Sequence, residues 1–367
     1  MNKKKIKLTQ VSRHAYPSIG GIEDVIKQIT ESLPEEEFEQ EIITCSKTAK
    51  SAIENGVNMK RCKYFYEFAS NPISLSFIWE LSKVDTDILH YHMPYIFAVI
   101  AHFIARPKYK KLSITYHGDI FGYDKYMKIF NKLYEAFLDK VDVIHILSIL
   151  TPIPEKYKYK CKIIPYGTQL PNEYTANVKL KEKYENKKIL FSVGRLARYK
   201  GFIYALEAMK QVSDDCILLI AGEGPLKESL QDYIDKNNLK NKVQLLGKIS
   251  DKELNEYYKT CDIYLFPSIM RSEAFGIVQL EAMRCSTPII NTSLNTGVNY
   301  VSINNETGLT VEPENPQKLV DAINLLLNND ELRLNFGQNA RKRVEEVFDI
   351  NKIKPQYVDF YSDLMKD

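Results

Sequence analysis

Apolar and polar positions follow a regular succession along the chain, in which short apolar runs alternate with longer amphipathic stretches. The runs are rich in β-branched residues and bounded by turn residues, which is typical of buried strands. The stretches between them carry apolar residues at helical spacing. This succession predicts alternating strands and helices, and therefore parallel sheets of the α/β class.

The apolar runs fall into two sets of six. In the first half of the chain we expect strands at 6–11, 41–45, 87–91, 112–116, 141–147 and 161–165. In the second half we expect them at 189–193, 217–221, 243–246, 261–266, 288–291 and 309–311. Six runs in each half predict two similar, doubly wound Rossmann-like domains.

The turn-rich stretch 165–177 is the expected linker between these domains. A chain of 367 residues suits two domains better than one. We therefore expect a first domain at 1–171 and a second at 172–350. Aromatic and aliphatic residues at helical spacing predict a last helix near 350–365.

Composition excludes several classes of protein. The net charge is only +3, and residues 1–171 hold 24 basic and 19 acidic residues, a net +5, so neither half indicates a nucleic-acid binder. The six cysteines include no C-x-x-C pair, which gives zinc sites no support and favours a reducing, cytoplasmic location. No apolar run reaches the length of a membrane span.

The most informative stretch follows the run at 261–266. Glu273 stands in a loop after this expected strand, and Glu281 stands eight positions later on an expected helix. Gly276 precedes that helix and lets a ligand approach the backbone closely. Free N–H donors suited to an anion are expected on Phe275, Gly276 and Ile277. Carboxylates for hydroxyl groups beside N–H donors for a phosphate favour a nucleotide-sugar site.

Three further loops follow expected strands at the edge where ligands bind in such sheets. Gly20 and Gly21 permit a tight turn after the first strand, although paired glycines often only make turns. His117 follows the strand at 112–116 and could hydrogen-bond a sugar hydroxyl. Arg195 and Lys200 flank a loop that could hold a diphosphate between a planar guanidinium and a point charge.

These motifs together resemble the retaining GT-B glycosyltransferases of family 4. The resemblance rests on Glu-x7-Glu followed by Ala-Met at 273–283, G-G-x-E at 20–23, the His-x-Asp after the strand at 112–116, and G-R-L-x-x-x-K-G at 194–201. Two departures are visible, since Ala274 stands where the family usually has Gly, and residues 295–298 lack its P-x-G-G pattern. The second departure leaves the donor sugar open.

The resemblance implies a GT-B fold, in which two Rossmann-like domains face across a cleft and 351–367 packs back on the first domain. It implies transfer of a hexose from a UDP- or GDP-sugar to a sugar hydroxyl with retention, without a cofactor or an obligatory metal. It also implies roles for individual residues. Arg195 and Lys200 would hold the diphosphate, and Gly20 and Gly21 would close over it. Glu281 would bind the ribose, Glu273 would contact the donor sugar, and His117 would shape the reacting face.

Two other patterns are open to a structural reading. The triplet at 85–87 is a D-x-D, which would suggest a metal-dependent GT-A enzyme. It leads directly into Ile-Leu-His-Tyr-His, which resembles a strand of the GT-B family, so we reject the metal site. His90 and His92 alternate on that strand, and this spacing favours packing over a functional site.

The stretch 123–140 predicts an amphipathic helix with basic flanks. Two interpretations remain equal, an ordinary half-buried helix and a surface that docks the first domain on an anionic membrane. The expected acceptor is a growing glycan on a lipid carrier, as in O-antigen, capsule or lipopolysaccharide synthesis. The expected location is therefore cytoplasmic, peripheral to the inner face of the cytoplasmic membrane.

Three alternative functions stay open. A GT-B sugar-nucleotide epimerase would act on the donor without an acceptor. A phosphorylase or starch-synthase-like enzyme would act on soluble glucan. A two-domain sugar-binding protein without catalysis would bind free sugar as tightly as nucleotide-sugar, and it would not need Arg195 and Lys200 to converge on a diphosphate.

Overall fold

The computed structural model describes residues 4–18, 20–48, 51–54, 56–68, 71–118, 124–171, 177–184 and 187–366; the side chains of 68 and 124–130 are not among those described. The chain forms two compact units. The first unit comprises Met1–Gly167 and Ile350–Asp367, and the second comprises Thr168–Asp349. The two units are described separately below.

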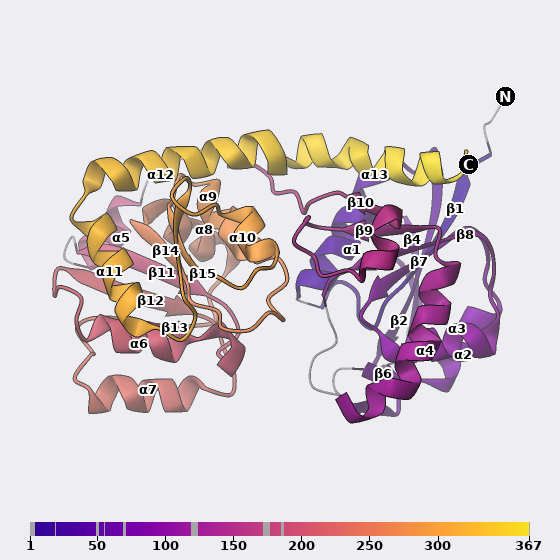
Figure 1. The fold of residues 1–367 in the computed structure, drawn as a ribbon, viewed down its shortest axis with the longest axis horizontal. Coiled ribbons are helices and arrows are strands. Elements are labelled where there is room, and N and C mark those ends of the chain that lie inside the picture. Colours follow the sequence, from indigo (N-terminus) through magenta and orange to yellow (C-terminus); the bar gives the residue numbers. More distant parts are fainter. Residues whose placement is uncertain are drawn as a thin grey trace. The chain divides into compact units, whose positions relative to one another are not determined.

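An eight-stranded sheet with the order β10-β9-β8-β7-β1-β2-β4-β3 forms the centre of the first unit (Figure 1). Its strands are β1 (Ile6–Val11), β2 (Phe38–Ser46), β3 (Ala52–Glu54), β4 (Val57–Lys63), β7 (Asp85–Met93), β8 (Lys108–Tyr116), β9 (Val143–Ile146) and β10 (Cys161–Ile163). Every neighbouring pair is parallel except β3 and β4. A two-stranded antiparallel sheet, β5 (Tyr66–Phe68) and β6 (Asn71–Ile73), lies apart from it.

The prediction of six strands in the first half was therefore incomplete. It missed the strands β3 and β4 of the main sheet, as well as β5 and β6. In β4 only Val57, Met59 and Cys62 are buried, and the charged Lys60 and Arg61 interrupt the apolar pattern. A strand near a sheet edge needs few apolar residues, so a search for apolar runs does not find it.

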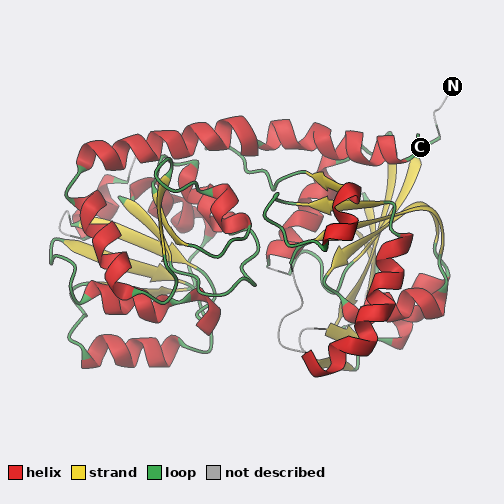
Figure 2. Ribbon diagram, viewed as in Figure 1, coloured by secondary structure: helices red, strands yellow, loops and turns green. Residues whose placement is uncertain are grey.

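Helices cover both faces of this sheet (Figure 2). One face carries α1 (Gly21–Ser32) and α13 (Ile350–Leu364), which pack against each other. The other face carries α2 (Leu75–Ser82), α3 (Ile96–Ala105) and α4 (Asp124–Lys140) around a core that includes Tyr91 and Phe137. Because Tyr357 and Tyr361 of α13 are fully buried, the prediction that the last helix returns to the first domain is confirmed.

The second unit has a six-stranded, wholly parallel sheet with the order β13-β12-β11-β14-β15-β16. The strands are β11 (Lys188–Val193), β12 (Cys216–Ala221), β13 (Val243–Gly247), β14 (Ile263–Phe266), β15 (Ile289–Thr292) and β16 (Gly308–Val311). All six predicted runs become strands, and both units are Rossmann-like, which confirms the predicted fold class.

The helices of the second unit are α5 (Val178–Lys183), α6 (Phe202–Met209), α7 (Lys227–Lys236), α8 (Asp251–Thr260), α9 (Ile277–Met283), α10 (Gly297–Val301), α11 (Pro316–Leu327) and α12 (Asp330–Arg343). A capping box is present at the start of α8. Ser250 Oγ accepts from the Glu253 N–H, and the Glu253 carboxylate accepts from the Ser250 N–H.

Candidate functional site

Two loops meet at the carboxyl edge of the second sheet, where β11 and β14 end. The Ile269 N–H donates to the Tyr199 carbonyl over 2.8 Å. Gly201 has φ +65° and lies against the Pro267 carbonyl so closely that a Cβ atom would collide with it. Only glycine allows this approach. The loop after β11, which contains Lys200, is thereby fastened to the loop after β14, which contains Glu273.

Lys200 and Glu273 form an ion pair, with 2.6 Å between Nζ and Oε2. The Lys200 residue is only 8% exposed, and its ammonium lies 5.0 Å from the ring centre of Phe266 and 5.5 Å from that of Tyr199. Aromatic faces attract a cation, so they help to hold this charge away from water. The structure therefore joins two residues that the sequence had assigned separately to phosphate and to sugar.

The backbone around Glu273 is held by the loop after β15. Thr296 Oγ1 donates to the Glu273 carbonyl over 2.8 Å. A Cβ atom on Gly297 would lie 2.5 Å from the Ala274 carbonyl oxygen, so this close contact also needs glycine. The stretch that departs from the family pattern, 295–298, thus supports the loop that carries Glu273.

Helix α9 begins after Gly276, whose φ of +75° lies in the left-handed region. A Cβ atom there would lie 2.7 Å from Gln279 Nε2. Within the described part of the chain, the N–H groups of Phe275, Gly276 and Ile277 donate no hydrogen bond. The Phe275 side chain is buried, so this residue offers its backbone rather than its ring. Three free donors at this edge suit an anionic oxygen.

Glu281 lies on the second turn of α9 and is half-buried. The Tyr258 hydroxyl donates to its Oε2 over 2.7 Å. Burial raises the pKa of Glu281, while this hydrogen bond acts in the opposite direction. One carboxylate oxygen is therefore fixed by Tyr258.

The loop after β11 is shaped by a second turn. The N–H of Leu196 donates to the Glu223 carbonyl over 2.9 Å, and a Cβ atom on Gly224 would collide with the Leu196 carbonyl. The turn at 222–225 thus holds the backbone next to Arg195, whose side chain is exposed. An exposed guanidinium can reach a ligand without losing a protein partner.

The predicted residues of the first unit lie at the carboxyl edge of its own sheet. Gly20 is the N-cap of α1 and Gly21 is its first residue. A Cβ atom on Gly20 would collide with the Glu23 carboxylate, so a larger residue there would displace the end of that side chain. Ile19 lies outside the described residues, as do Asp119 and Tyr123.

His117 follows β8, and its N–H donates to the Met93 carbonyl at the end of β7 over 2.9 Å. Its Nε2 lies 3.1 Å from His92 Nδ1, and the two rings are stacked. Burial lowers the pKa of His117 to about 3, with smaller contributions from His145 and the positive charge of Arg13. His117 is therefore a neutral imidazole at pH 7.

His90 and His92 are fully buried, as the packing interpretation predicts, but both are also hydrogen-bonded. His92 contacts a candidate site residue directly. The sequence reasoning missed Gln10, which lies in β1 and hydrogen-bonds to His92, and Arg13, which follows β1 and whose charge acts on His117. A polar residue inside an apolar run was the available signal for Gln10.

The ten candidate residues thus form two groups. Gly20, Gly21 and His117 belong to the first unit. The second unit brings together the remaining members, which are Arg195, Lys200, Glu273, Phe275, Gly276, Ile277 and Glu281.

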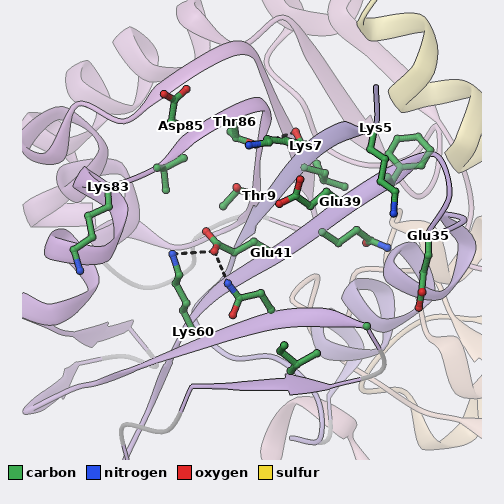
Figure 3. A pocket seen from close by; sticks show the side chains of 17 residues that line it. Lys5, Lys7, Thr9, Glu35, Glu39, Glu41, Lys60, Lys83, Asp85 and Thr86 are labelled. Carbon is green, nitrogen blue, oxygen red and sulfur yellow. Dashed lines mark hydrogen bonds and ion pairs between the residues drawn. The ribbon is translucent and has the colours of Figure 1, made fainter. Parts of the chain in front are cut away.

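The D-x-D triplet lies at the opposite edge of the first sheet, where β7 begins. Asp87 pairs with Lys110 at 2.7 Å and accepts from the Lys7 N–H at 2.9 Å, while Asp85 is exposed. Lys7, Asp85 and Thr86 border a pocket of about 360 Å³ in which Lys60 pairs with Glu41 (Figure 3). Lysines alternate with carboxylates there, so the triplet has a structural role. Among the described residues, no group of three or more metal-ligating side chains is found.

Known proteins match the chain over both units. The family model described as Glycosyl transferases group 1 matches residues 174–343, and that of Glycosyltransferase Family 4 matches 19–149. The O-antigen chain mannosyltransferase C of Escherichia coli is 31% identical over 98% of this chain and 99% of its own length. The chain belongs to glycosyltransferase family 4. The D-rhamnosyltransferase WbpZ of Pseudomonas aeruginosa is 30% identical over 90% of this glycosyltransferase and 89% of its own length.

Solved structures agree on the fold of this glycosyltransferase. Sucrose-phosphate synthase from Thermosynechococcus elongatus superposes with a TM-score of 0.79 at 21% identity, covering 99% of this chain and 100% of the other. WaaG, a glycosyltransferase involved in lipopolysaccharide biosynthesis, gives 0.69 at 14% identity, covering 96% and 99%. In the described residues, no helix combines the length and apolar character that a membrane span requires.

Proposed function

We propose that this glycosyltransferase moves a hexose from a nucleotide-diphosphate sugar to a sugar hydroxyl of a glycan acceptor, with retention of configuration and without a metal. The ion pair between Lys200 and Glu273, beside three unused N–H donors, carries this proposal. A buried ammonium next to free donors suits a diphosphate. Relatives support the class of acceptor, since they include enzymes named for O-antigen chain mannosyl transfer and for galactosaminyl transfer to a diphospho-undecaprenol.

The roles follow from these contacts. Arg195 and Lys200 bind the diphosphate, and Lys200 leaves the Glu273 carboxylate as it does so. Glu273 then accepts a hydrogen bond from a hydroxyl of the donor sugar. Glu281 accepts a hydrogen bond from a ribose hydroxyl through the carboxylate oxygen that Tyr258 does not contact. Fixed cations stabilise the charge that develops on the leaving diphosphate, which is the contribution that a divalent metal makes in other enzymes. For the first unit we propose that Gly20 and Gly21 offer backbone contacts to a phosphate and that His117 contacts a sugar hydroxyl.

Solved neighbours support the donor class. HepE of Anabaena, which resembles this chain with a TM-score of 0.74–0.75 at 17% identity, has been solved with UDP and with UDP-glucose. Calorimetry of UDP and GDP binding in EDTA tests the proposal. One nucleotide should bind to the wild type, and Lys200→Ala should abolish that binding. Binding of neither nucleotide, or binding only after addition of Mg²⁺, would contradict it.

Retention and transfer need a separate assay. The anomeric configuration of the product, read by NMR coupling constants during the reaction with a glycan acceptor, should equal that of the donor. An inverted product would refute the retaining mechanism while leaving glycosyl transfer intact. Donor consumption without an acceptor would instead identify an epimerase or a hydrolase.

We further propose that the first unit docks on an anionic membrane, where a lipid-linked acceptor would lie, at the cytoplasmic face. Helix α4, on which the sequence placed this surface, uses Phe137 and Leu138 in the core. The neighbouring helices α2 and α3 instead carry large apolar side chains that are exposed on the surface. Their exposed fractions are 72% for Leu75, 64% for Trp79, 37% for Ile100 and 60% for Ile104. Trp and aliphatic side chains of this kind bind at the membrane interface.

The membrane proposal has a built-in probe, because Trp79 is the single tryptophan of the sequence. The Lys83 ammonium lies 4.8 Å from the centre of its ring. A basic side chain at this position suits an anionic lipid. Vesicles with anionic lipid should shift the tryptophan emission to the blue, and Trp79→Ala with Ile104→Ser should reduce flotation. Neutral vesicles are the control. Unchanged emission at low salt would refute docking through this face.

A further inference from the structure

A chain of hydrogen bonds runs through the first unit from α1 to His117. Thr30 Oγ1 lies 2.7 Å from the carbonyl oxygen of Ile26, one turn earlier in the helix. Gln10 Nε2 lies 3.1 Å from Thr30 Oγ1, and Gln10 Oε1 lies 2.9 Å from His92 Nε2. His92 Nδ1 in turn lies 3.1 Å from His117 Nε2. Three side chains, those of Thr30, Gln10 and His92, therefore connect the backbone of a helix to a candidate site residue.

The first link fixes the direction of the next. A carbonyl oxygen only accepts, so the single hydroxyl proton of Thr30 goes to Ile26. Toward Gln10, Thr30 can then only accept, and the amide nitrogen is the only part of that side chain that donates. The amide oxygen of Gln10 must consequently face His92.

The same reasoning continues through the two imidazoles. Because the Gln10 oxygen accepts, His92 Nε2 carries a proton. Burial lowers the pKa of His92 well below its usual range and that of His117 to about 3, so each ring is neutral and holds one proton. His92 Nδ1 is then an acceptor, and His117 Nε2 donates to it. The lone pair of His117 is left on Nδ1.

We propose that Thr30, Gln10 and His92 are positioning residues that hold His117 in the Nε2–H tautomer and present its Nδ1 as a hydrogen-bond acceptor for a sugar hydroxyl. This inference rests on the proposed function for the identity of the ligand. In this tautomer His117 offers no N–H at Nδ1, so at that atom it cannot donate to a phosphate oxygen. Nδ1 accepts from an O–H donor instead.

A second buried network beside the first provides the control. His90 Nδ1 lies 2.7 Å from Ser113 Oγ and 3.2 Å from the Tyr361 hydroxyl. His90 Nε2 lies 2.8 Å from Thr115 Oγ1, which also contacts His145. Among the described residues, no hydrogen bond joins this network to His117. Ser113→Ala therefore removes a buried histidine partner without touching the relay.

The tautomer is measured directly on the full chain, labelled with ¹⁵N in histidine and without ligand. Long-range ¹H–¹⁵N correlation should show His117 Nδ1 as the unprotonated nitrogen and Nε2 as the protonated one. The opposite tautomer, or an average of both, would overturn the proposal. This result does not depend on activity, so it stands or falls separately from the proposed function.

Variants connect the tautomer to catalysis. In Gln10→Leu the acceptor for His92 is lost, so His117 should sample both tautomers, and kcat/KM should fall about tenfold, the value of one hydrogen bond. A buried, protonated Gln10→Glu still donates to Thr30 and accepts from His92, so it should retain both properties. Thr30→Val frees the amide to rotate and gives a second test should Gln10→Leu fail to fold.

Three outcomes separate the possibilities. Mixed tautomers with reduced kcat/KM in Gln10→Leu and Thr30→Val, against an unchanged tautomer and rate in Ser113→Ala, support the relay. An unchanged kcat/KM in both relay variants despite mixed tautomers would overturn the positioning role. A wild-type protein that shows the expected tautomer but transfers no sugar and binds no nucleotide would refute the proposed function alone.

Discussion

The two carboxyl sheet edges of this glycosyltransferase hold a candidate site residue in opposite ways. In the second unit the contact joins charged groups, and Lys200 is held by the Glu273 carboxylate at 2.6 Å. In the first unit the contacts join neutral groups, and His92 and His117 are held by each other and by Gln10. A charged pair can exchange one partner for a ligand of the same charge, whereas a neutral relay keeps its protons where they are. The difference predicts that one edge changes partners on binding while the other stays fixed.

The largest effect is expected from Lys200→Ala. It removes the diphosphate contact and leaves the Glu273 carboxylate without its cation, so kcat/KM should fall by about 10²–10³, as for other contacts to a developing negative charge. Steady-state kinetics with the preferred nucleotide-sugar measure this. Lys240→Ala is the matched control, because Lys240 pairs with Asp235 at 3.5 Å on the surface and should have no effect. A decrease of less than tenfold would mean that the buried pair is only structural.

The reverse variant, Glu273→Gln, tests whether the pair really exchanges partners. Transfer should decrease by roughly 10²-fold, since the sugar loses a charged acceptor. Nucleotide binding should become tighter rather than weaker, because Lys200 no longer has to leave a carboxylate. Calorimetry with UDP or GDP, compared with Lys200→Ala, distinguishes the two variants by the sign of the change in Kd. Weaker binding in both would show that the two residues act as a unit.

The neutral edge predicts a dependence of stability on pH. Burial lowers the pKa of His117 to about 3 and that of His145 to about 4, against about 6.5 in an unfolded chain. The unfolded chain therefore takes up protons that the folded chain does not, and the free energy of unfolding falls as the pH drops below about 6.5. Between pH 7.5 and 5 the loss should be about 2 kcal/mol per buried histidine.

Urea denaturation at both pH values measures this loss. His145→Gln should reduce the pH dependence, because it removes one of the buried histidines. Equal pH dependence in the variant and the wild type would show that His145 is not among the groups that titrate.

The smallest effect concerns the support of the charged pair. Thr296→Val removes the hydrogen bond to the Glu273 carbonyl and should cost about 1 kcal/mol of stability together with a few-fold decrease in kcat. Ser250→Ala removes the cap of α8 and should cost about the same stability. Only the first should affect transfer, since Thr296, unlike Ser250, holds the loop that carries Glu273. A kinetic effect of Ser250→Ala would mean that stability alone limits the rate.

The sequence predicted the parts of the molecule that depend on neighbouring residues. The strands of the second sheet and the loops that carry Arg195 and Glu273 come from local patterns. It missed β4 because Lys60 and Arg61 interrupt the apolar pattern of that strand. Their charges are paired with Glu41 and Glu54, which the sequence alone does not reveal. It predicted the helix at 123–140 but not that Phe137 packs in the core, because amphipathicity does not say what covers the apolar face.

The candidate site was predictable as a list of residues but not as a set of contacts. Lys200 and Glu273 are 73 positions apart, and their loops are brought together by the Gly201 contact with Pro267 and by the hydrogen bond from Ile269 to Tyr199. Gln10 and His92 are 82 positions apart and meet because β1 and β7 are neighbours in the sheet. A single sequence reveals which side chains could react. It does not reveal which residues on neighbouring strands contact one another, because those contacts depend on the strand order of the sheet.

Helix α13 has a consequence for how the protein is made. The ribosome completes all of Thr168–Asp349 before it adds Ile350–Leu364, yet the latter segment belongs to the first unit. The nascent second unit can therefore fold as one continuous piece, while the first must wait with the face around His90 and His145 uncovered until Tyr357 and Tyr361 arrive. During translation, the first unit is therefore the first to begin forming and the last to be completed.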